Sequence, residues 1–405
     1  MGQDPFLAED GDQDSGLLNH GRRVAALAIE ISRMAGFSAA MQPMLDQAAR
    51  FHHYLDMSRH STPLSRLAWS VVCGDEGTED AQRQLEAVTG IVRLCNLVDE
   101  RFEALPFDYQ DVETILDEVQ SFAPLEGFDP ALVEHFRQMQ CRGLPQQIKL
   151  GGGLPVETGA ARQVFGSLGQ DREYEVSELA AAAVRDPVLA ASLIGVANSS
   201  LYSPASRLSG VAQAISFIGT AQARKVMLAA VLRPLFASAG LTRLWSHSVA
   251  AAQFCSALAR QTEFIGADEA LLLGLVHDFG ALAVQFAPRK TSDTYARLLE
   301  GGCPATYVER LLFGCDHGEI GAEILAEWNF SRRLIEAVQF HHQPERSDSL
   351  LAAFTYLVEA WSGLDEDLPS FNRVEDCLHR TGLSLEALAQ AGTEDKALKT
   401  LRLIA

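Results

Sequence analysis

Apolar residues recur along this chain with the spacing of an amphipathic helix. Val211, Ala214, Ile215 and Ile218 fall at positions i, i+3, i+4 and i+7, which places them on one face of a helix. Residues 190–197 repeat the pattern. Clean alternation of apolar and polar residues over five or more positions, the mark of a half-buried strand, is hard to find. The sequence therefore predicts an all-α fold without a sheet.

Glycine and proline mark the predicted breaks between helices, at 186–187, 202–204 and 301–304. The triple glycine 151–153 is the best candidate for a domain boundary, because three residues without Cβ are entropically costly to order inside an element. The predicted organisation is an acidic tail (1–15), a helical domain (16–140), a linker (141–153), a main helical domain (154–362) and appended helices (363–405).

Composition excludes several classes of protein. The chain has 33 Lys and Arg against 53 Asp and Glu, a net charge of −20, which argues against binding to nucleic acid or to an anionic membrane. Its 7 cysteines form no CxxC pair, so neither a disulfide framework nor a zinc ribbon is expected. The first residues lack a signal-peptide pattern, and the uncharged run 187–206 contains two prolines. We expect a cytoplasmic protein with no nucleic-acid or membrane partner.

The region 245–359 holds five of the 11 histidines, at the ends of predicted helices, with Asp278 beside one of them and Glu359 on a further predicted helix. Imidazole nitrogen and carboxylate oxygen are mixed ligands for a metal ion, which would turn a bound water into a nucleophile for a phosphate ester. Histidines at helix ends also cap carbonyls and interact with the helix dipole, and the residues alone leave both roles open. The residues concerned are His247, His277, Asp278, His317, His341, His342 and Glu359.

Four segments in a fixed order carry a family resemblance. Over residues 154–361 the chain resembles an HDOD domain, a divergent branch of the HD metal-dependent phosphohydrolase superfamily. This resemblance implies an all-α fold and a place in bacterial signalling proteins, often as an output module. The segments are RDPVL (185–189), ANSSLY (197–202), AISFIG (214–219) and GLVHDFG (274–280).

The resemblance implies a ligand set for one ion. His247, His277 and Asp278 match the first three ligands of the HD superfamily. Glu359 falls where the last aspartate of the superfamily is expected, and it is longer by one methylene. Gly280, after the His-Asp pair, is a predicted C-cap of the preceding helix. The implied cofactor is one or two divalent ions, iron, manganese or zinc.

The resemblance also implies a second ion, and the chain departs from the family pattern at two places. His317, His341 and His342 match the extra histidines of the dinuclear HD-GYP branch. That branch has a phosphate-binding lysine where this chain has Ala281, and its Gly-Tyr-Pro loop is replaced by residues 343–346. Loss of this cation removes charge stabilisation from the transition state of phosphate ester cleavage, so the departures favour metal retention without cyclic dinucleotide cleavage.

The predicted N-terminal domain shows a weaker resemblance to an HD-GYP domain. Residues 19–28 resemble its opening helix, 48–56 its His-Asp turn and 94–105 its final-aspartate helix. Most of the remaining ligand region is missing, so we interpret residues 16–140 as a truncated, degenerate copy, with an unrelated helical bundle as the alternative. Five residues remain that could hold one metal ion, and we expect that this ion is no longer bound. They are His20, His52, His53, Asp56 and Asp99.

The sequence predicts two helical HD-like domains joined by a glycine-rich linker, acting as a largely non-catalytic module of signal transduction. Its partner is expected to be a signalling protein or a nucleotide-like small molecule, and a homodimer is compatible with the sequence. One alternative is a metal-dependent phosphohydrolase of phosphomonoesters or phosphodiesters, in which Asp278 is the catalytic residue that orients the attacking water. Another is a nucleotide-binding receptor without turnover.

Overall fold

A computed structural model describes residues 9–50, 52, 79–104, 112–141, 174–185, 187–233, 241–328, 330–362 and 371–391. These residues form helices and no strand, which confirms the all-α prediction. The first helix begins at Glu9, inside the predicted acidic tail. The triple glycine lies outside the described residues. The fold divides into two compact units.

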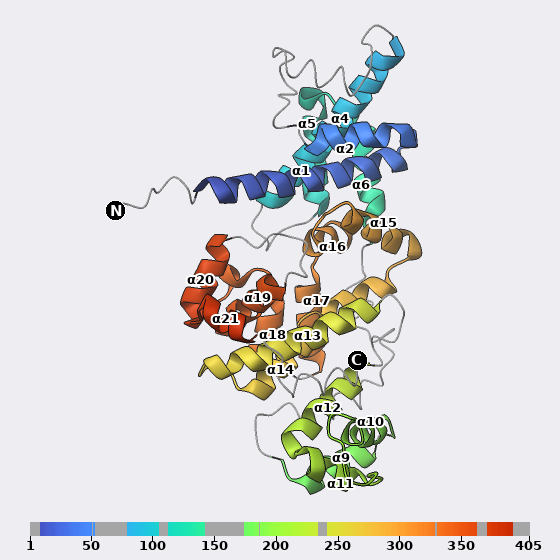
Figure 1. Ribbon diagram of the computed structural model, residues 1–405. Coiled ribbons are helices and arrows are strands. Elements are labelled where there is room, and N and C mark those ends of the chain that lie inside the picture. The colour runs from blue at the N-terminus through green and yellow to red at the C-terminus, as the bar shows by residue number, and fades with distance from the viewer. Residues whose placement is uncertain are drawn as a thin grey trace, which may run out of the picture. The chain divides into compact units, whose positions relative to one another are not determined.

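The N-terminal unit is built from residues 1–143 together with 287–316. The helices α1, α2 and α4 pack against one another, and Figure 1 shows α1 beside α2. Leu27, Ile31, Leu45 and Ile91 are fully buried between them. Its described helices are α1 (Glu9–Met34), α2 (Gln42–Arg50), α4 (Glu79–Ala104), α5 (Val112–Glu126), α6 (Val133–Met139), α15 (Arg289–Glu300) and α16 (Ala305–Phe313), with the 3-10 turns η1 (Ala39–Met41) and η3 (Pro130–Leu132).

Residues 287–316 pack with the N-terminal unit although they lie inside the range 154–362 predicted for the main domain. The buried Glu30 of α1 accepts hydrogen bonds from Arg297 Nε of α15 at 2.9 Å and from Arg33 Nε at 3.0 Å. A Cβ on Gly301 would stand 2.6 Å from Ala26 Cβ, so the chain after α15 lies against α1. An ion pair and close backbone packing therefore join α15 to α1 across more than 260 residues of sequence.

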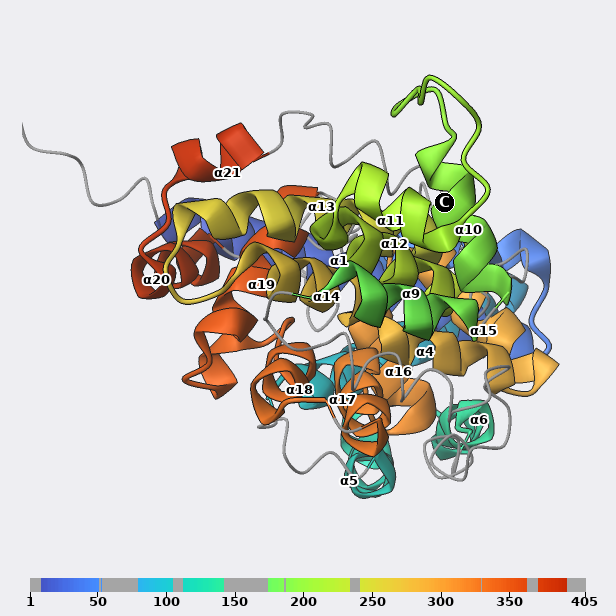
Figure 2. The same ribbon diagram turned by 90° about the horizontal axis from the view of Figure 1, so that it is seen from below.

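The second unit consists of residues 144–286, 317–365 and 369–405. Helices α9 to α12 pack together, and α13 and α14 run side by side (Figures 1 and 2). The breaks predicted at 186–187 and 202–204 separate α9, α10 and α11. Its described helices are α9 (Val176–Val184), α10 (Pro187–Ala197), α11 (Val211–Ile218), α12 (Thr220–Leu232), α13 (Thr242–Leu258), α14 (Ala267–Val276), α17 (His317–Glu327), α18 (Arg332–Gln339), α19 (Leu350–Ser362), α20 (Phe371–Thr381) and α21 (Leu385–Ala391), with the 3-10 turns η6 (Ala259–Gln261), η7 (Phe279–Phe286) and η8 (Pro344–Arg346).

The described helices are short or carry too many charges for a membrane span. No single helix there is long and apolar enough to cross a bilayer. The helices α11 and α12 meet the length and hydropathy criteria only when taken together, and they are bent by 119° relative to each other.

Candidate metal centre

Seven side chains from the second unit form two groups in which the donor atoms lie within 4.8 Å of one another. They come from α13, from the ends of α14 and α18, from the start of α17 and from α19. The structure thus brings together every ligand that the sequence predicted. The first group is His247, His277 and Glu359, and the second group is Asp278, His317, His341 and His342.

The first group is a tight triad of nitrogen and oxygen atoms. His277 Nε2 lies 2.8 Å from Glu359 Oε1, and His247 Nε2 lies 3.3 Å from the same oxygen. The two Nε2 atoms are 3.1 Å apart. The extra methylene of Glu359, relative to the aspartate expected at this position, does not keep its carboxylate out of the site.

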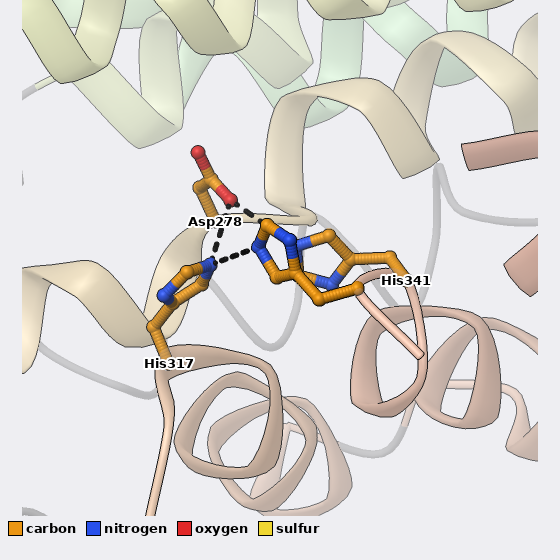
Figure 3. A group of neighbouring side chains, drawn as sticks. Asp278, His317 and His341 are labelled. Carbon is orange, nitrogen blue, oxygen red and sulfur yellow. Dashed lines mark hydrogen bonds and ion pairs between the residues drawn. The ribbon is translucent and has the colours of Figure 1, made fainter. Parts of the chain in front are cut away.

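The second group surrounds the carboxylate of Asp278. Figure 3 shows the imidazoles of His317, at the start of α17, and of His341, in the turn after α18, directed at Asp278. Asp278 Oδ1 lies 3.3 Å from His317 Nε2 and 3.4 Å from His341 Nε2. His342 Nε2 lies 2.7 Å from His317 Nε2, which places a third imidazole in this group.

Asp278 also contacts the first group. Its Oδ2 lies 3.0 Å from His247 Nε2, and its Oδ1 lies 3.3 Å from His277 Nε2. One carboxylate therefore faces imidazoles of both groups. Carboxylates can ligate through either oxygen, so this position suits a residue shared between two ions.

Two buried histidines, His277 and His341, use Nδ1 for a hydrogen bond to the backbone. Their Nε2 lone pairs are then directed toward the other side chains of the two groups. His277 Nδ1 lies 2.9 Å from Gly274 O, and His341 Nδ1 lies 2.6 Å from Val338 O. In the neutral rings the proton therefore sits on Nδ1, and Nε2 is an acceptor. His277 Nε2 then faces a carboxylate, also an acceptor, at 2.8 Å, and His341 Nε2 is buried with no hydrogen-bond partner among the described residues. Acceptors that face one another need a proton or a metal cation between them, and the arrangement therefore fits a metal.

Burial and mutual charge set the protonation of the centre. Burial disfavours the ionised form of Asp278, but His277 and His247 hold its pKa well below the ordinary value. The same two histidines, against the effect of burial, lower the pKa of Glu359. Burial would lower the pKa of His247, yet the two carboxylates outweigh it and raise that pKa to about 11. Burial lowers the pKa of His341 to about 4, so this ring is neutral at pH 7, the form in which histidine binds a metal.

Two glycines allow the ligand-bearing elements to approach closely. A Cβ on Gly274 of α14 would lie 2.5 Å from the backbone nitrogen of Ala252 on α13, the helix that carries His247. A Cβ on Gly280 would lie 1.8 Å from the carbonyl oxygen of His317. Gly280 was predicted to cap α14, but α14 ends at Val276 and Gly280 lies within η7. A glycine is required at position 280 because the backbone packs closely against α17, and not because a helix ends there.

The donor set indicates which metals the centre would take. Five imidazoles and two carboxylates form the two groups. Imidazole suits zinc, iron and other transition ions, whereas magnesium and calcium prefer sites built from oxygen. The mixed set therefore fits a transition metal, and the choice among iron, manganese and zinc stays a prediction, as does the catalytic role of Asp278.

Comparison with known proteins identifies a part of the chain that lies mostly in the second unit. Residues 154–344 match the HDOD domain family, so this part of the chain is an HDOD domain. The match includes all five histidines of the centre, and Glu359 lies beyond it. The degenerate HD-GYP-like interpretation of residues 16–140 stays a prediction.

A curated relative is the uncharacterized protein of Treponema pallidum (strain Nichols), which is 22% identical over 212 residues. The match covers 49% of this chain and 40% of that protein, so the chain spans well under two thirds of its relative.

Two solved structures share the fold. A candidate phosphohydrolase from Shewanella amazonensis SB2B has a TM-score of 0.51 at 21% identity, covering 66% of this chain and 100% of its own. A candidate signal transduction protein from Marinobacter aquaeolei VT8 has a TM-score of 0.51 at 19% identity, covering 77% of this chain and 63% of its own.

Proposed function

We propose that this HDOD protein is a largely non-catalytic regulatory module of bacterial signal transduction, with a metal centre that binds a partner without efficient turnover. The observation that carries the proposal is Ala281, which stands in η7 three residues after Asp278. By the family resemblance, a lysine that meets the substrate phosphate is expected there. A methyl group cannot stabilise the negative charge that develops during phosphate ester cleavage.

The ligand set supports binding of an anionic group. A bound metal would polarise a phosphate oxygen and lower the pKa of a bound water. The chain's own residues would fix the ions and exclude other orientations, because His277 and His341 are fully buried and held by backbone carbonyls. His247, His277 and Glu359 would hold one ion, His317, His341 and His342 would hold the other, and Asp278 would be shared.

The partner that we propose for the centre is a small molecule with a phosphate group, of nucleotide type, and a signalling protein remains the other partner class. Support for a signalling role comes from the HDOD domain itself and from the shared fold of the candidate signal transduction protein of Marinobacter aquaeolei. The acidic surface of the chain would suit a protein partner with a basic patch.

A specific observation favours a metal-dependent phosphohydrolase as the second candidate. Asp278 contacts both groups of ligands, with Oδ2 at 3.0 Å from His247 and Oδ1 at 3.3 Å from His317. A carboxylate in that position could orient a water for attack on phosphorus. The fold is also shared with the candidate phosphohydrolase of Shewanella amazonensis.

One experiment separates the two candidates. Full-length protein is reconstituted with iron, manganese or zinc and analysed for metal content, for binding of inorganic phosphate by calorimetry, and for hydrolysis of p-nitrophenyl phosphate and bis(p-nitrophenyl) phosphate. The variants are wild type, the double variant His277→Ala with Asp278→Ala, and Ala281→Lys, which restores the missing cation.

The regulatory proposal expects metal and phosphate binding by the wild type, hydrolysis no faster than that of the double variant, and faster hydrolysis by Ala281→Lys. Wild-type hydrolysis that the double variant loses would replace this proposal with the phosphohydrolase. A wild-type protein that binds no metal after reconstitution would overturn both.

A further inference from the structure

The N-terminal unit contains a second convergence of side chains that the HDOD match does not reach. His20 lies on α1, His52 follows α2, and Asn96 lies on α4. His20 Nε2 and His52 Nε2 are 3.1 Å apart, and Asn96 Oδ1 lies 3.0 Å from the former and 2.7 Å from the latter. We call these three residues the N-terminal triad. Two other sequence candidates, His53 and Asp56, lie outside the described residues.

Each imidazole of the triad is oriented by a partner at its other nitrogen. His20 Nδ1 lies 2.7 Å from the buried carboxylate of Asp99, and Arg23 holds that carboxylate through two hydrogen bonds of 2.9 and 3.0 Å. His52 Nδ1 lies 2.6 Å from Ala49 O. In the neutral rings both protons therefore sit on Nδ1, and both Nε2 atoms are acceptors. Histidine ligands of metals are oriented in this way, by a carboxylate or a backbone carbonyl.

Asn96 adds a third acceptor to the same point. Its Nδ2 donates to Glu100 Oε1 at 2.9 Å, which fixes the amide so that Oδ1 faces the two imidazoles. Three lone-pair atoms thus meet within 3.1 Å of one another. Their mutual repulsion would be relieved by a proton or a metal cation between them. Ligand atoms around a tetrahedral ion with bonds of about 2.0–2.1 Å are roughly 3.3 Å apart, so the spacing of the triad is close to that of a ligand set.

The triad closely reproduces the geometry of the first group in the HDOD domain. The corresponding separations there, among His247, His277 and Glu359, are 3.1, 3.3 and 2.8 Å. The imidazole centroids are 5.0 Å apart and the rings inclined by 56° in both places. His52 corresponds to His277, since each donates Nδ1 to the carbonyl three residues earlier. Asn96 takes the place of Glu359.

We propose that the N-terminal triad is a second, mononuclear metal site, formed by His20 Nε2, His52 Nε2 and Asn96 Oδ1. Two imidazoles and an amide oxygen suit a late first-row divalent ion such as zinc or cobalt rather than magnesium or calcium. The triad contributes no charged ligand, so it binds more weakly than the centre of the HDOD domain. The ion joins α1, α4 and the end of α2, and it stabilises the N-terminal unit.

The test uses the full chain in the background His277→Ala, Asp278→Ala and His317→Ala, which leaves only two donor side chains in each group of the HDOD centre. Co²⁺ is titrated at pH 7.5, and its absorption spectrum and the elemental content report occupancy. We expect one equivalent of Co²⁺ in this background. Adding His52→Ala should weaken binding by at least about 100-fold, because one of three ligands is lost. Adding Asn96→Asp should tighten it about 10-fold, because a carboxylate replaces a neutral amide.

His135→Ala, a histidine of α6 in the same unit, is the matched control and should leave Co²⁺ affinity unchanged. Circular dichroism and thermal unfolding show whether each variant is folded. The gain expected for Asn96→Asp cannot arise from misfolding, so it separates ligation from structural damage. A folded background variant that binds no Co²⁺, with a proton in place of the metal, would overturn the site. So would binding that is insensitive to both His52→Ala and Asn96→Asp.

Discussion

Gly280 lies so close to His317 that a Cβ on the glycine would stand 1.8 Å from the carbonyl oxygen of the histidine. The same Cβ would be 2.7 Å from the backbone nitrogen of Gly321, one turn further along α17. Gly280 follows Asp278 by two residues, and His317 is the first residue of α17. The absence of a side chain at Gly280 therefore allows Asp278 and His317, two members of the second group, to lie close together.

We expect Gly280→Ala to displace α17 and to cost at least about 1–3 kcal/mol of unfolding free energy, as overpacking does. Metal occupancy should fall toward that of the first group alone, because His317 moves with its helix. Gly195→Ala is the matched control. Gly195 has no atom near its Cβ position and is exposed on α10, so alanine there should stabilise the protein by about 0.5–1 kcal/mol. Denaturant unfolding checks both, and equal stability of Gly280→Ala and wild type would contradict the packing account.

Glu359→Gln should weaken metal binding while preserving the shape of the side chain. The glutamate oxygen lies 2.8 Å from His277 and 3.3 Å from His247, and it is the one carboxylate of the first group. Removing its charge should lower the affinity at that group by at least about 10-fold, since ligand charge strongly tunes metal affinity. Glu359→Asp keeps the charge and should lose less. Competition titration with a chromogenic chelator measures both, and equal affinities for glutamine and glutamate would remove Glu359 from the ligand set.

The sequence predicted the helical class, and the seven side chains that it proposed as ligands lie together in the structure. The His277-Asp278 pair is a local pattern, and the other five positions followed from the family resemblance. Other features depend on which helices meet in space. The reach of Glu359 follows from the position of α19, and the role of Gly280 from the approach of α17. Asn96 is not among the sequence candidates, because an amide is not a usual metal ligand and Asp99, three residues later, is the aspartate of the segment 94–105. That aspartate instead orients His20.

The packing of residues 287–316 with the N-terminal unit could not be predicted from the sequence either. It depends on contacts such as that between Glu30 and Arg297, which are 267 residues apart. Periodicity identifies the apolar face of a helix, but it does not say which other helix covers that face.

Chelation should destabilise the HDOD domain. A ligand that binds the folded state alone adds about 2.7 kcal/mol of stability at a free concentration of 100 times its dissociation constant. Metal-loaded wild type should therefore unfold at a higher temperature than protein dialysed against EDTA, and re-addition of zinc should restore the difference. In His277→Ala with Asp278→Ala this zinc-dependent shift should shrink, because one imidazole of the first group and the shared carboxylate are lost. A shift of full size in the double variant would place the stabilising ion elsewhere.

The ion pairs of Glu30 should make the stability of the N-terminal unit sensitive to acid. Burial would raise the pKa of Glu30, but Arg33 and Arg297 outweigh it and lower the pKa from 4.5 to about 2. The unfolded chain therefore binds a proton at higher pH than the folded chain. The stabilisation is fully present above about pH 4.5 and is lost as the pH falls from there toward 2. At neutral pH, Glu30→Gln should cost about 2–3 kcal/mol, because two arginines lose their buried partner.

Urea unfolding at pH 7 and at pH 3 tests this dependence. The difference in unfolding free energy between the two pH values should be smaller in Glu30→Gln than in wild type, because glutamine has no carboxyl group to protonate. Glu126→Gln is the control, since Glu126 is exposed at the end of α5, and it should leave the difference unchanged. If Glu30→Gln retained the full acid sensitivity of the wild type, the protonation responsible would lie at other carboxylates, and the attachment of α15 to α1 would rest on packing rather than on this ion pair.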